Sequence, residues 1–286
     1  MTTTHTRSGE STERVLVLGG TGKTGRRVAE RLTTLGVPVR IGSRSAHPPF
    51  EWNDPSTWGP VLKGVRSVYI AYHPDLAVPG AADTIQAFTD AAVQRGAQHL
   101  VLLAGRGEDE ADRCEQIVQA SGVDWTILRP TWFNQNFSEG FLREAVVGGT
   151  VALPVTDVLE PFVDVEDIAD VAVAALTDPD RHAGQVYELT GPRLMSFSEA
   201  VGEIARARGE EIQFVPIAPE TFTAALEEQE VPGDFIWLLG YLFREVMDGR
   251  NSHLADGVQR ALGRPPRDFR HYAERTAAAG MWGVVA

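Results

Sequence analysis

A glycine-rich loop placed directly after a short apolar segment constrains this chain more than any other feature. The apolar residues 15–18 lead into Gly19-Gly-Thr-Gly-Lys-Thr-Gly25, and apolar side chains then recur at helical spacing over 26–35. A continuous apolar run of this length, ended by glycines, is typical of a strand buried in a parallel sheet. A second strand over 37–41 completes a segment of about 30 residues, which is the size of one βαβ unit.

The same alternation of strand and helix continues along the chain. We expect strands over 65–72, 99–103, 125–128 and 186–189, helices over 81–95, 111–121 and 166–176, and short strands over 151–153 and 162–165. Strands that alternate with helices predict a parallel sheet with right-handed crossovers. The fold class is therefore α/β, a Rossmann-type doubly wound parallel sheet.

The pattern loosens in the second half of the chain. A helix is expected over 196–208, where Ser196 and Glu199 have capping-box spacing, and another over 219–250, broken near Pro232-Gly233. A last amphipathic helix is expected over 268–281. We predict a polar, disordered tail without a signal peptide over 1–13. We predict a nucleotide-binding core over 14–189 with elements returning from 260–282, and a small, mainly helical substrate lobe over 190–260.

The glycine loop matches the dinucleotide-binding pattern G-x-G-x-x-G through Gly20, Gly22 and Gly25. Its glycines permit a tight turn, a close backbone approach to a pyrophosphate and close helix–strand packing. A phosphotransferase P-loop would need glycine where Val17 stands, which argues against it. The residues predicted to hold the cofactor phosphates are Gly19, Gly20, Thr21, Gly22, Lys23, Thr24 and Gly25.

The end of the second strand selects between NADP(H) and NAD(H). Enzymes that use NAD often place a carboxylate there, whereas this chain has Ser43 and Arg44. A guanidinium binds phosphate as a rigid fork, so we predict a preference for the 2′-phosphate of NADP(H), with NAD(H) as the alternative. Residues 14–44 hold seven of the 26 basic residues but one of the 39 acidic residues. Of these basic residues, Arg26, Arg27 and Arg31 are interpreted as a solvated helix face.

Overall charge and composition exclude other classes of protein. A net charge of −13 argues against nucleic acid and anionic membrane surfaces as partners. The single cysteine, Cys114, excludes an intrachain disulfide, and the seven histidines are scattered without metal-binding spacing. We expect a cytoplasmic protein with no metal site.

Five segments together resemble a known family. They are Gly19–Gly25, Gly122–Pro130, Trp132–Phe137, Phe162–Ala169 and Leu262–Phe269, and they resemble the NmrA-like branch of atypical short-chain dehydrogenases. The resemblance implies a Rossmann core that binds NADP(H) or NAD(H) at the strand ends. It places Trp132 and Phe133 on the nicotinamide side, although both are equally consistent with the hydrophobic core. Members include reductases of quinones, of aromatic ketones and in polyketide tailoring, and redox sensors without turnover.

This chain departs from the family's dehydrogenases at the catalytic residues. They usually carry Tyr-x-x-x-Lys, in which the lysine lowers the pKa of the tyrosine that protonates the substrate. The only lysines are Lys23 and Lys63, and glycine stands four residues before each. The family's serine after the fourth core strand is replaced by Ala104-Gly105. The usual proton donor is therefore missing.

Other residues are candidates for the active site. Ala71, Tyr72 and His73 end the third strand. Tyr72 or His73 is a candidate to donate a proton or a hydrogen bond to the substrate. The alternative is that Tyr72 packs against the nicotinamide and that His73 is a solvated turn residue. Arg106 is a candidate to stabilise an oxyanion, but it is interpreted as pairing with Glu108 or Asp109 in a surface loop. Asn136 is a predicted substrate contact, although asparagine at this position can instead cap a turn. Trp237 and Tyr241 are also predicted to contact the substrate. They lie on an apolar helix that either covers an aromatic ligand or packs on the sheet.

Three functions are consistent with these residues. The first is an NAD(P)H-dependent reductase of a small hydrophobic quinone or aromatic ketone, which can be the reductase part of an oxygen-dependent hydroxylation in polyketide tailoring. A quinone accepts hydride without a strong acid, because its ring stabilises the phenolate product. The second is an NADP-sensing regulator without turnover that acts through a protein partner. The third is an isomerase or epimerase that uses bound nucleotide.

Overall fold

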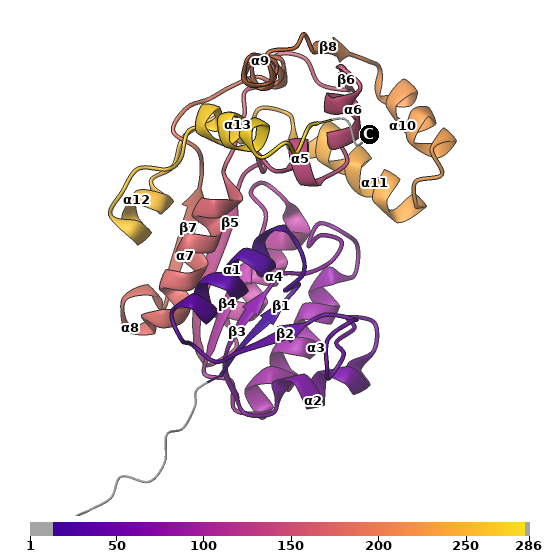
Figure 1. Ribbon diagram of the computed structural model, residues 1–286. Helices are drawn as coiled ribbons and strands as arrows, with labels where there is room; N and C mark the ends of the chain where they lie inside the picture. The colour runs from indigo at the N-terminus through magenta and orange to yellow at the C-terminus, as the bar shows by residue number, and fades with distance from the viewer. Residues whose placement is uncertain (1–13, 284–286) are drawn as a thin grey trace, which may run out of the picture.

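The centre of the molecule is a six-stranded parallel sheet, seen in the lower half of Figure 1. The computed structural model describes residues 14–283. The spatial order is β2-β1-β3-β4-β5-β7. The strands are β1 (Arg14–Leu18), β2 (Val39–Gly42), β3 (Val65–Ile70), β4 (His99–Leu103), β5 (Asp124–Pro130) and β7 (Gln185–Leu189). The winding direction reverses between β1 and β3, so a crevice opens at their carboxyl ends. The predicted doubly wound α/β fold is confirmed.

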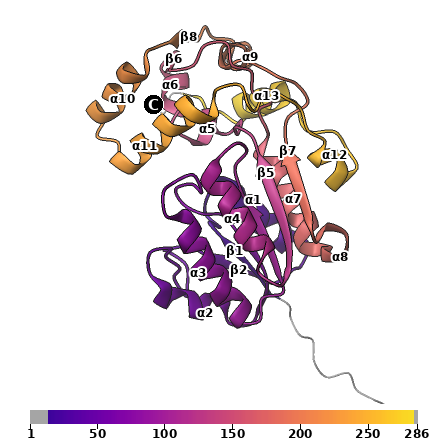
Figure 2. The same ribbon diagram turned by 180° about the vertical axis from the view of Figure 1, so that it is seen from behind.

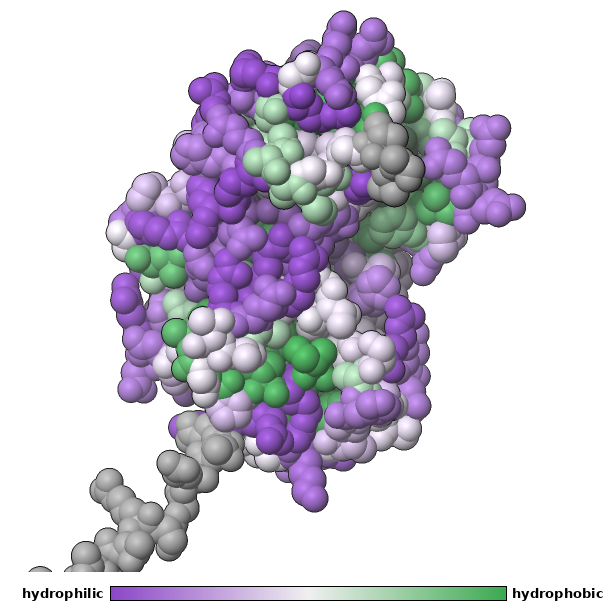
Figure 3. Space-filling view, viewed as in Figure 1, coloured by the Kyte–Doolittle hydropathy of each residue, from purple (hydrophilic) through white to green (hydrophobic). Residues whose placement is uncertain are grey.

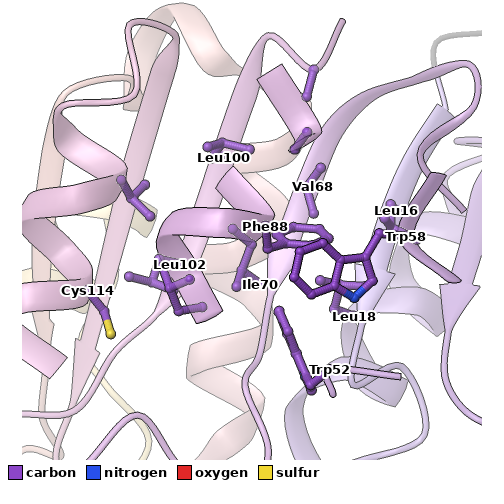
Figure 4. Packing of buried hydrophobic residues seen from close by; sticks show 14 of the residues in the cluster. Leu16, Leu18, Trp52, Trp58, Val68, Ile70, Phe88, Leu100, Leu102 and Cys114 are labelled. Atoms are coloured by element: carbon purple, nitrogen blue, oxygen red, sulfur yellow. The ribbon is translucent and has the colours of Figure 1, made fainter. Parts of the chain in front are cut away.

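Helices cover both faces of the sheet, which explains why its strands are apolar on both sides. Leu16 and Leu18 of β1 point to the layer of α2 (Trp58–Leu62), α3 (Ala81–Gln94) and α4 (Asp109–Gln119). Val15 and Val17 point to the opposite layer of α1 (Lys23–Thr34) and α7 (Val165–Thr177). Figure 4 shows the first layer, where the ring of Phe88 lies 5.2 Å from that of Trp52 and 5.5 Å from that of Trp58.

A second lobe lies above the carboxyl edge of the sheet (Figures 1 and 2). It contains α5 (Asn136–Glu139), α6 (Arg143–Val147), β6 (Thr150–Leu153), α9 (Phe197–Arg208), β8 (Gln213–Pro216), α10 (Pro219–Glu228), α11 (Gly233–Tyr241), a π-helical turn η2 (Leu242–Val246) and α13 (Phe269–Ala278). One aromatic core joins these elements, including Phe137, Phe197, Phe243 and Phe269. The lobe is therefore larger than the segment 190–260 predicted from the sequence, and it draws on residues near 140 and near 270.

Two smaller elements lie along the far edge of the sheet. Helix α8 (Pro179–His182) follows α7, and α12 (Gly257–Leu262) brings the chain back to pack against β7 and α7. Of the segment 260–282, which was predicted to return to the core, only its beginning does so, because α13 packs on α9 in the lobe. The predicted tail over 1–13 lies outside the described residues.

One of the predicted strands is absent from the structure, and the capping of the following helix explains why. Residues 162–165 do not form a strand, and Val163 makes only an isolated bridge to Phe133. The Asp164 side chain accepts a hydrogen bond from the Glu166 N–H at 3.0 Å and starts α7, so the extended segment ends there. At α9 the predicted capping box between Ser196 and Glu199 is present.

The arginines of α1 do not form a solvated face, contrary to the interpretation from the sequence. Arg27 donates to Glu139 at 2.7 Å and to Glu166 at 2.6 Å, and its side chain is only 12% exposed. Arg26 pairs with Glu139, and Arg31 pairs with Glu166 and Asp170. The reason is tertiary: α1 packs along α7, whose acidic residues face the arginines. Burial opposes ionisation of Glu166, but its bonds to Arg27 and Arg31 lower its pKa to about 2.

Candidate active site

The glycine loop closes tightly at the amino end of α1. The Gly22 N–H donates to the Gly19 carbonyl oxygen at 2.8 Å. A Cβ atom on Gly25 would lie 2.2 Å from that same oxygen, and one on Gly20 would lie 2.9 Å from Ile41 Cγ2. Side chains at these two positions would break the helix–loop and strand–loop contacts. The loop thus has the compact shape that a dinucleotide pyrophosphate requires, and it borders two cavities.

The first cavity lies between the glycine loop and the end of β2, with a volume of about 460 Å³. Ser43 and Arg44 line it together with Gly19 and Thr21 of the loop, and Phe50 and Trp52 close the far side. Among residues 14–283 the exposed Arg44 guanidinium has no ion-pair partner, so its charge is available to a ligand. These residues fit an adenosine 2′-phosphate.

The second cavity, of about 430 Å³, continues from the loop along the ends of β3 and β4. Ala71, Tyr72 and His73 line it, as does Phe133 from the opposite side. Tyr72 is half-buried and its ring lies 4.9 Å from that of Trp52, while His73 is exposed. The structure thus brings these four predicted residues beside the glycine loop, where a nicotinamide ribose would lie.

The third cavity, of about 260 Å³, lies between the sheet edge and the lobe. Its wall of aromatic and aliphatic side chains includes Trp132, Phe141, Phe235, Leu238 and Leu242. Figure 3 shows hydrophobic residues gathered beneath α10 and α11, where the surface recedes between the lobe and the sheet. The second and third cavities share Lys23, Pro74, Asp75, Ala104 and Phe133. They therefore meet at one wall, and Trp132 lies on the lobe side of it rather than beside the glycine loop.

Lys23 extends from the glycine loop to this shared wall. Its Nζ donates to Asn136 Oδ1 at 3.0 Å, so the predicted substrate residue Asn136 is held against the loop. Burial lowers the pKa of Lys23, against the influence of Glu139 and Asp75. Lys23 thus links the phosphate loop to the start of the lobe.

Arg106 is not in a surface loop with Glu108 or Asp109, as the sequence suggested. It is 5% exposed, donates to the His253 carbonyl oxygen at 2.9 Å and pairs with Glu188 at 3.3 Å. The chain after α11 folds back over the end of β4, and it provides partners that local sequence cannot indicate. Arg106 lines the third cavity.

The predicted residues Trp237 and Tyr241 lie together but do not line the third cavity. Trp237 is 41% exposed, and its ring stacks on that of Tyr241 at 5.5 Å and 4°. The turns of the same helix that face the cavity carry Phe235 and Leu238 instead.

Three acidic residues of the third cavity were not predicted as site residues: Asp75, Glu108 and Glu160. Asp75 follows the predicted segment Tyr72-His73 by two residues, so its position was within reach of sequence reasoning. Glu108 was interpreted as a surface residue, and no local pattern indicates Glu160. Glu160 is fully buried, neither of its carboxyl oxygens has a hydrogen-bond partner among the described residues, and burial raises its pKa to about 7.

Residues 14–283 contain no group of three or more His, Cys, Asp or Glu side chains that could hold a metal ion. Within that same range, every helix is too short or too polar to cross a membrane.

The parallel sheet, the glycine loop at its switch point and the adjoining cavities define a Rossmann-type dinucleotide-binding protein. The chain belongs to the NAD(P)H-binding family, whose model matches residues 19–179. It is an NAD(P)H-dependent oxidoreductase, and the expected resemblance to the NmrA-like branch of atypical short-chain dehydrogenases is confirmed.

Relatives and solved structures agree with this assignment. The chain is 30% identical to the uncharacterized oxidoreductase YesF of Bacillus subtilis (92% of this chain and 95% of that protein). It is 28% identical to the NAD(P)H azoreductase of Xenophilus azovorans (93% and 98%). Its fold is similar to the NADPH complex of the quinone oxidoreductase QOR2 from Escherichia coli, at 19% identity and a TM-score of 0.76 (91% of this chain and 99% of that chain).

Proposed function

We propose that this chain transfers a hydride from NADPH to a small hydrophobic quinone or aromatic ketone. The observation that carries the proposal is the wall shared by two cavities, because the nicotinamide-side cavity opens directly onto one lined by aromatic side chains. A reduced nicotinamide supplies the hydride when it is bound. A flat acceptor in the third cavity would lie against it, and positioning is the main requirement of hydride transfer.

The chain's own residues bind and orient the two reactants. Backbone N–H groups of the glycine loop would hold the pyrophosphate, and Ser43 with Arg44 would bind the 2′-phosphate. Tyr72 and Phe133 would contact the nicotinamide side of the cofactor. On the other side of the shared wall, Trp132 and Phe235 bracket the acceptor ring and exclude water, which is the usual construction of a small-molecule site.

The names of the relatives support an aromatic acceptor. One relative is an azoreductase, and one structural neighbour is a quinone oxidoreductase. Both names describe reduction of conjugated, flat molecules. The third cavity of this chain has walls that suit such molecules.

The test is NADPH oxidation, followed by absorbance, against a panel of quinones and aromatic ketones. Turnover with at least one flat acceptor supports the proposal. A Gly25→Val variant is the negative control, because its side chain would fill the cradle beside Gly19 and prevent nucleotide binding. Nucleotide binding by the wild type without turnover of any acceptor contradicts the proposal and favours an NADP-sensing regulator that acts through a protein partner.

The same assay, run under air and under argon, examines a role in aromatic polyketide tailoring. A quinol formed by the reductase can react with oxygen, and the chain would then act as the reductase part of an oxygen-dependent hydroxylation. A hydroxylated product that forms only under air supports this role. Equal products in both atmospheres restrict the chain to reduction.

A further inference from the structure

Two carboxyl groups meet on the wall of the third cavity. Asp75 follows β3, and Glu108 immediately precedes α4. Their side chains are hydrogen-bonded to each other, and both line the cavity. Asp75 also lines the nicotinamide-side cavity, so the pair lies where the two reactants would meet.

Glu108 is held in place by the absence of a side chain at Gly105. A Cβ atom on Gly105 would lie 2.2 Å from Glu108 Oε2 and 2.3 Å from Oε1. The carboxyl group therefore occupies the space that any other residue at position 105 would fill. It is only 8% exposed, and Oε2 has no hydrogen-bond partner among the described residues. A buried polar atom without a partner, on a cavity wall, points to a ligand group.

The surroundings keep one proton on this pair. Burial raises the pKa of Glu108 well above its usual range, and the charges of Asp75, Asp112 and Glu115 raise it further. Burial also raises the pKa of Asp75, but the hydrogen bond that Asp75 Oδ1 accepts from the Ala77 N–H at 2.9 Å and the nearby charge of Lys23 oppose this rise. On α11, the titratable side chain near Glu108 is that of Tyr241. Glu108 is thus the protonated partner and Asp75 the acceptor.

Other acids of the cavity are less suitable as proton donors. Lys23 donates to Asn136, Arg106 donates to the chain near His253, and the Thr131 hydroxyl donates to the Pro161 carbonyl oxygen at 2.8 Å. Glu160 is buried in the same cavity, but it has no hydrogen-bond partner among the described residues, whereas Glu108 is paired with Asp75, which also lines the nicotinamide side. Tyr72 and His73 line only the nicotinamide side.

We propose that Glu108, hydrogen-bonded to Asp75, is the catalytic acid that protonates the reduced acceptor, in place of the missing tyrosine and lysine. The inference rests on the proposed reductase function. The acceptor gains two electrons and one hydrogen as hydride, which leaves a negative charge on its heteroatom. The Glu108 O–H turns from Asp75 to that heteroatom, the O–H bond breaks as the hydrogen bonds to the heteroatom, and the electron pair stays on Glu108. A proton from water restores the pair.

The first test compares Glu108→Gln with Glu160→Gln, a matched change of a buried acid in the same cavity. Glu108→Gln should lower kcat on an aromatic ketone about 100-fold, since its alkoxide needs an acid, and less than about tenfold on a quinone. Activity of the wild type should fall as pH rises through the pKa of Glu108, and this limb should vanish in the variant. Equal losses in both variants on both acceptors would overturn the proposal.

The second test needs neither nucleotide nor turnover. Infrared spectroscopy of the nucleotide-free protein, followed as pH is raised past the pKa of about 7 of Glu160, should show the carbonyl band of a buried carboxyl group that loses its proton at higher pH than Glu160 does. The band should disappear in Glu108→Gln and persist in Glu160→Gln. Gly105→Ala should shift it, because the new Cβ displaces the carboxyl group without removing it. Circular dichroism checks that each variant is folded.

The two tests separate this proposal from the proposed function. A wild type without the infrared band contradicts the assignment of Glu108 whether or not the enzyme reduces quinones. A wild type that shows the band but reduces no acceptor contradicts the reductase function, and with it the catalytic role of Glu108.

Discussion

Arg44 carries the prediction that depends most on a single side chain. It lies at the end of β2, lines the first cavity and has no ion-pair partner among residues 14–283. Because hydrogen bonds to charged groups contribute about 1.5–3 kcal/mol, Arg44→Ala should raise the Kd of NADPH about 10- to 100-fold and that of NADH less than about threefold. Isothermal titration with both nucleotides measures this. Arg113→Ala, an exposed arginine paired with Glu110, is the control. Equal losses for both nucleotides would remove Arg44 from the 2′-phosphate site.

Neighbouring residues on one helix can differ in role because only one side of the helix meets the cavity. In α11, Phe235 lines the third cavity, whereas Trp237 is exposed and stacks on Tyr241. We predict that Phe235→Ala raises KM for an aromatic acceptor about tenfold, and that Trp237→Ala changes it less than about twofold. Steady-state kinetics with one acceptor measure both values. A larger effect at Trp237 would show that the stacked pair binds substrate, as the sequence first suggested.

The contact between α1 and α7 predicts a dependence of stability on pH. Arg27 and Arg31 lower the pKa of Glu166 from 4.5 to about 2, so the ionised carboxylate stabilises the folded chain above pH 4.5. This contribution is lost as pH falls from 4.5 towards 2. Glu166→Gln should therefore lower the free energy of unfolding by about 2 kcal/mol at neutral pH, with a smaller difference near pH 3. Urea unfolding measures it, with the exposed Glu227→Gln as control. A difference that does not change with pH would contradict this account.

At the scale of the whole molecule, the nucleotide site is connected to the lobe. Lys23 bonds Asn136, and Arg26 and Arg27 bond Glu139, so α5 is tied to the glycine loop and α1. NADPH should therefore slow amide hydrogen exchange not only at 19–25 and 71–76 but also at 136–141. Hydrogen-exchange mass spectrometry measures this, with α9 as the unaffected reference. Protection limited to the loop and strand ends would show that the lobe does not respond to the nucleotide.

Much of the core could be predicted because its signals are local. The apolar run before Gly19, the loop glycines and the Ser196–Glu199 capping box each act within a few residues. The lobe was predicted less completely. Its core joins residues near 140, 200, 240 and 270, and no periodicity in the sequence relates such distant segments. Arg27 and Arg106 were misplaced for the same reason, because their partners Glu166 and Glu188 lie far along the chain.

The sequence by itself determined the parallel sheet, the nucleotide loop and the absence of a tyrosine–lysine pair, since these follow from residue type and short spacing. Only the tertiary structure decided what stands in the active site. It placed Glu108 against Gly105 and beside Asp75, set Phe235 rather than Trp237 on the cavity wall, and buried Glu160. The physical reason is that burial and charge pairing, which decide where a proton resides, depend on which distant segments pack together.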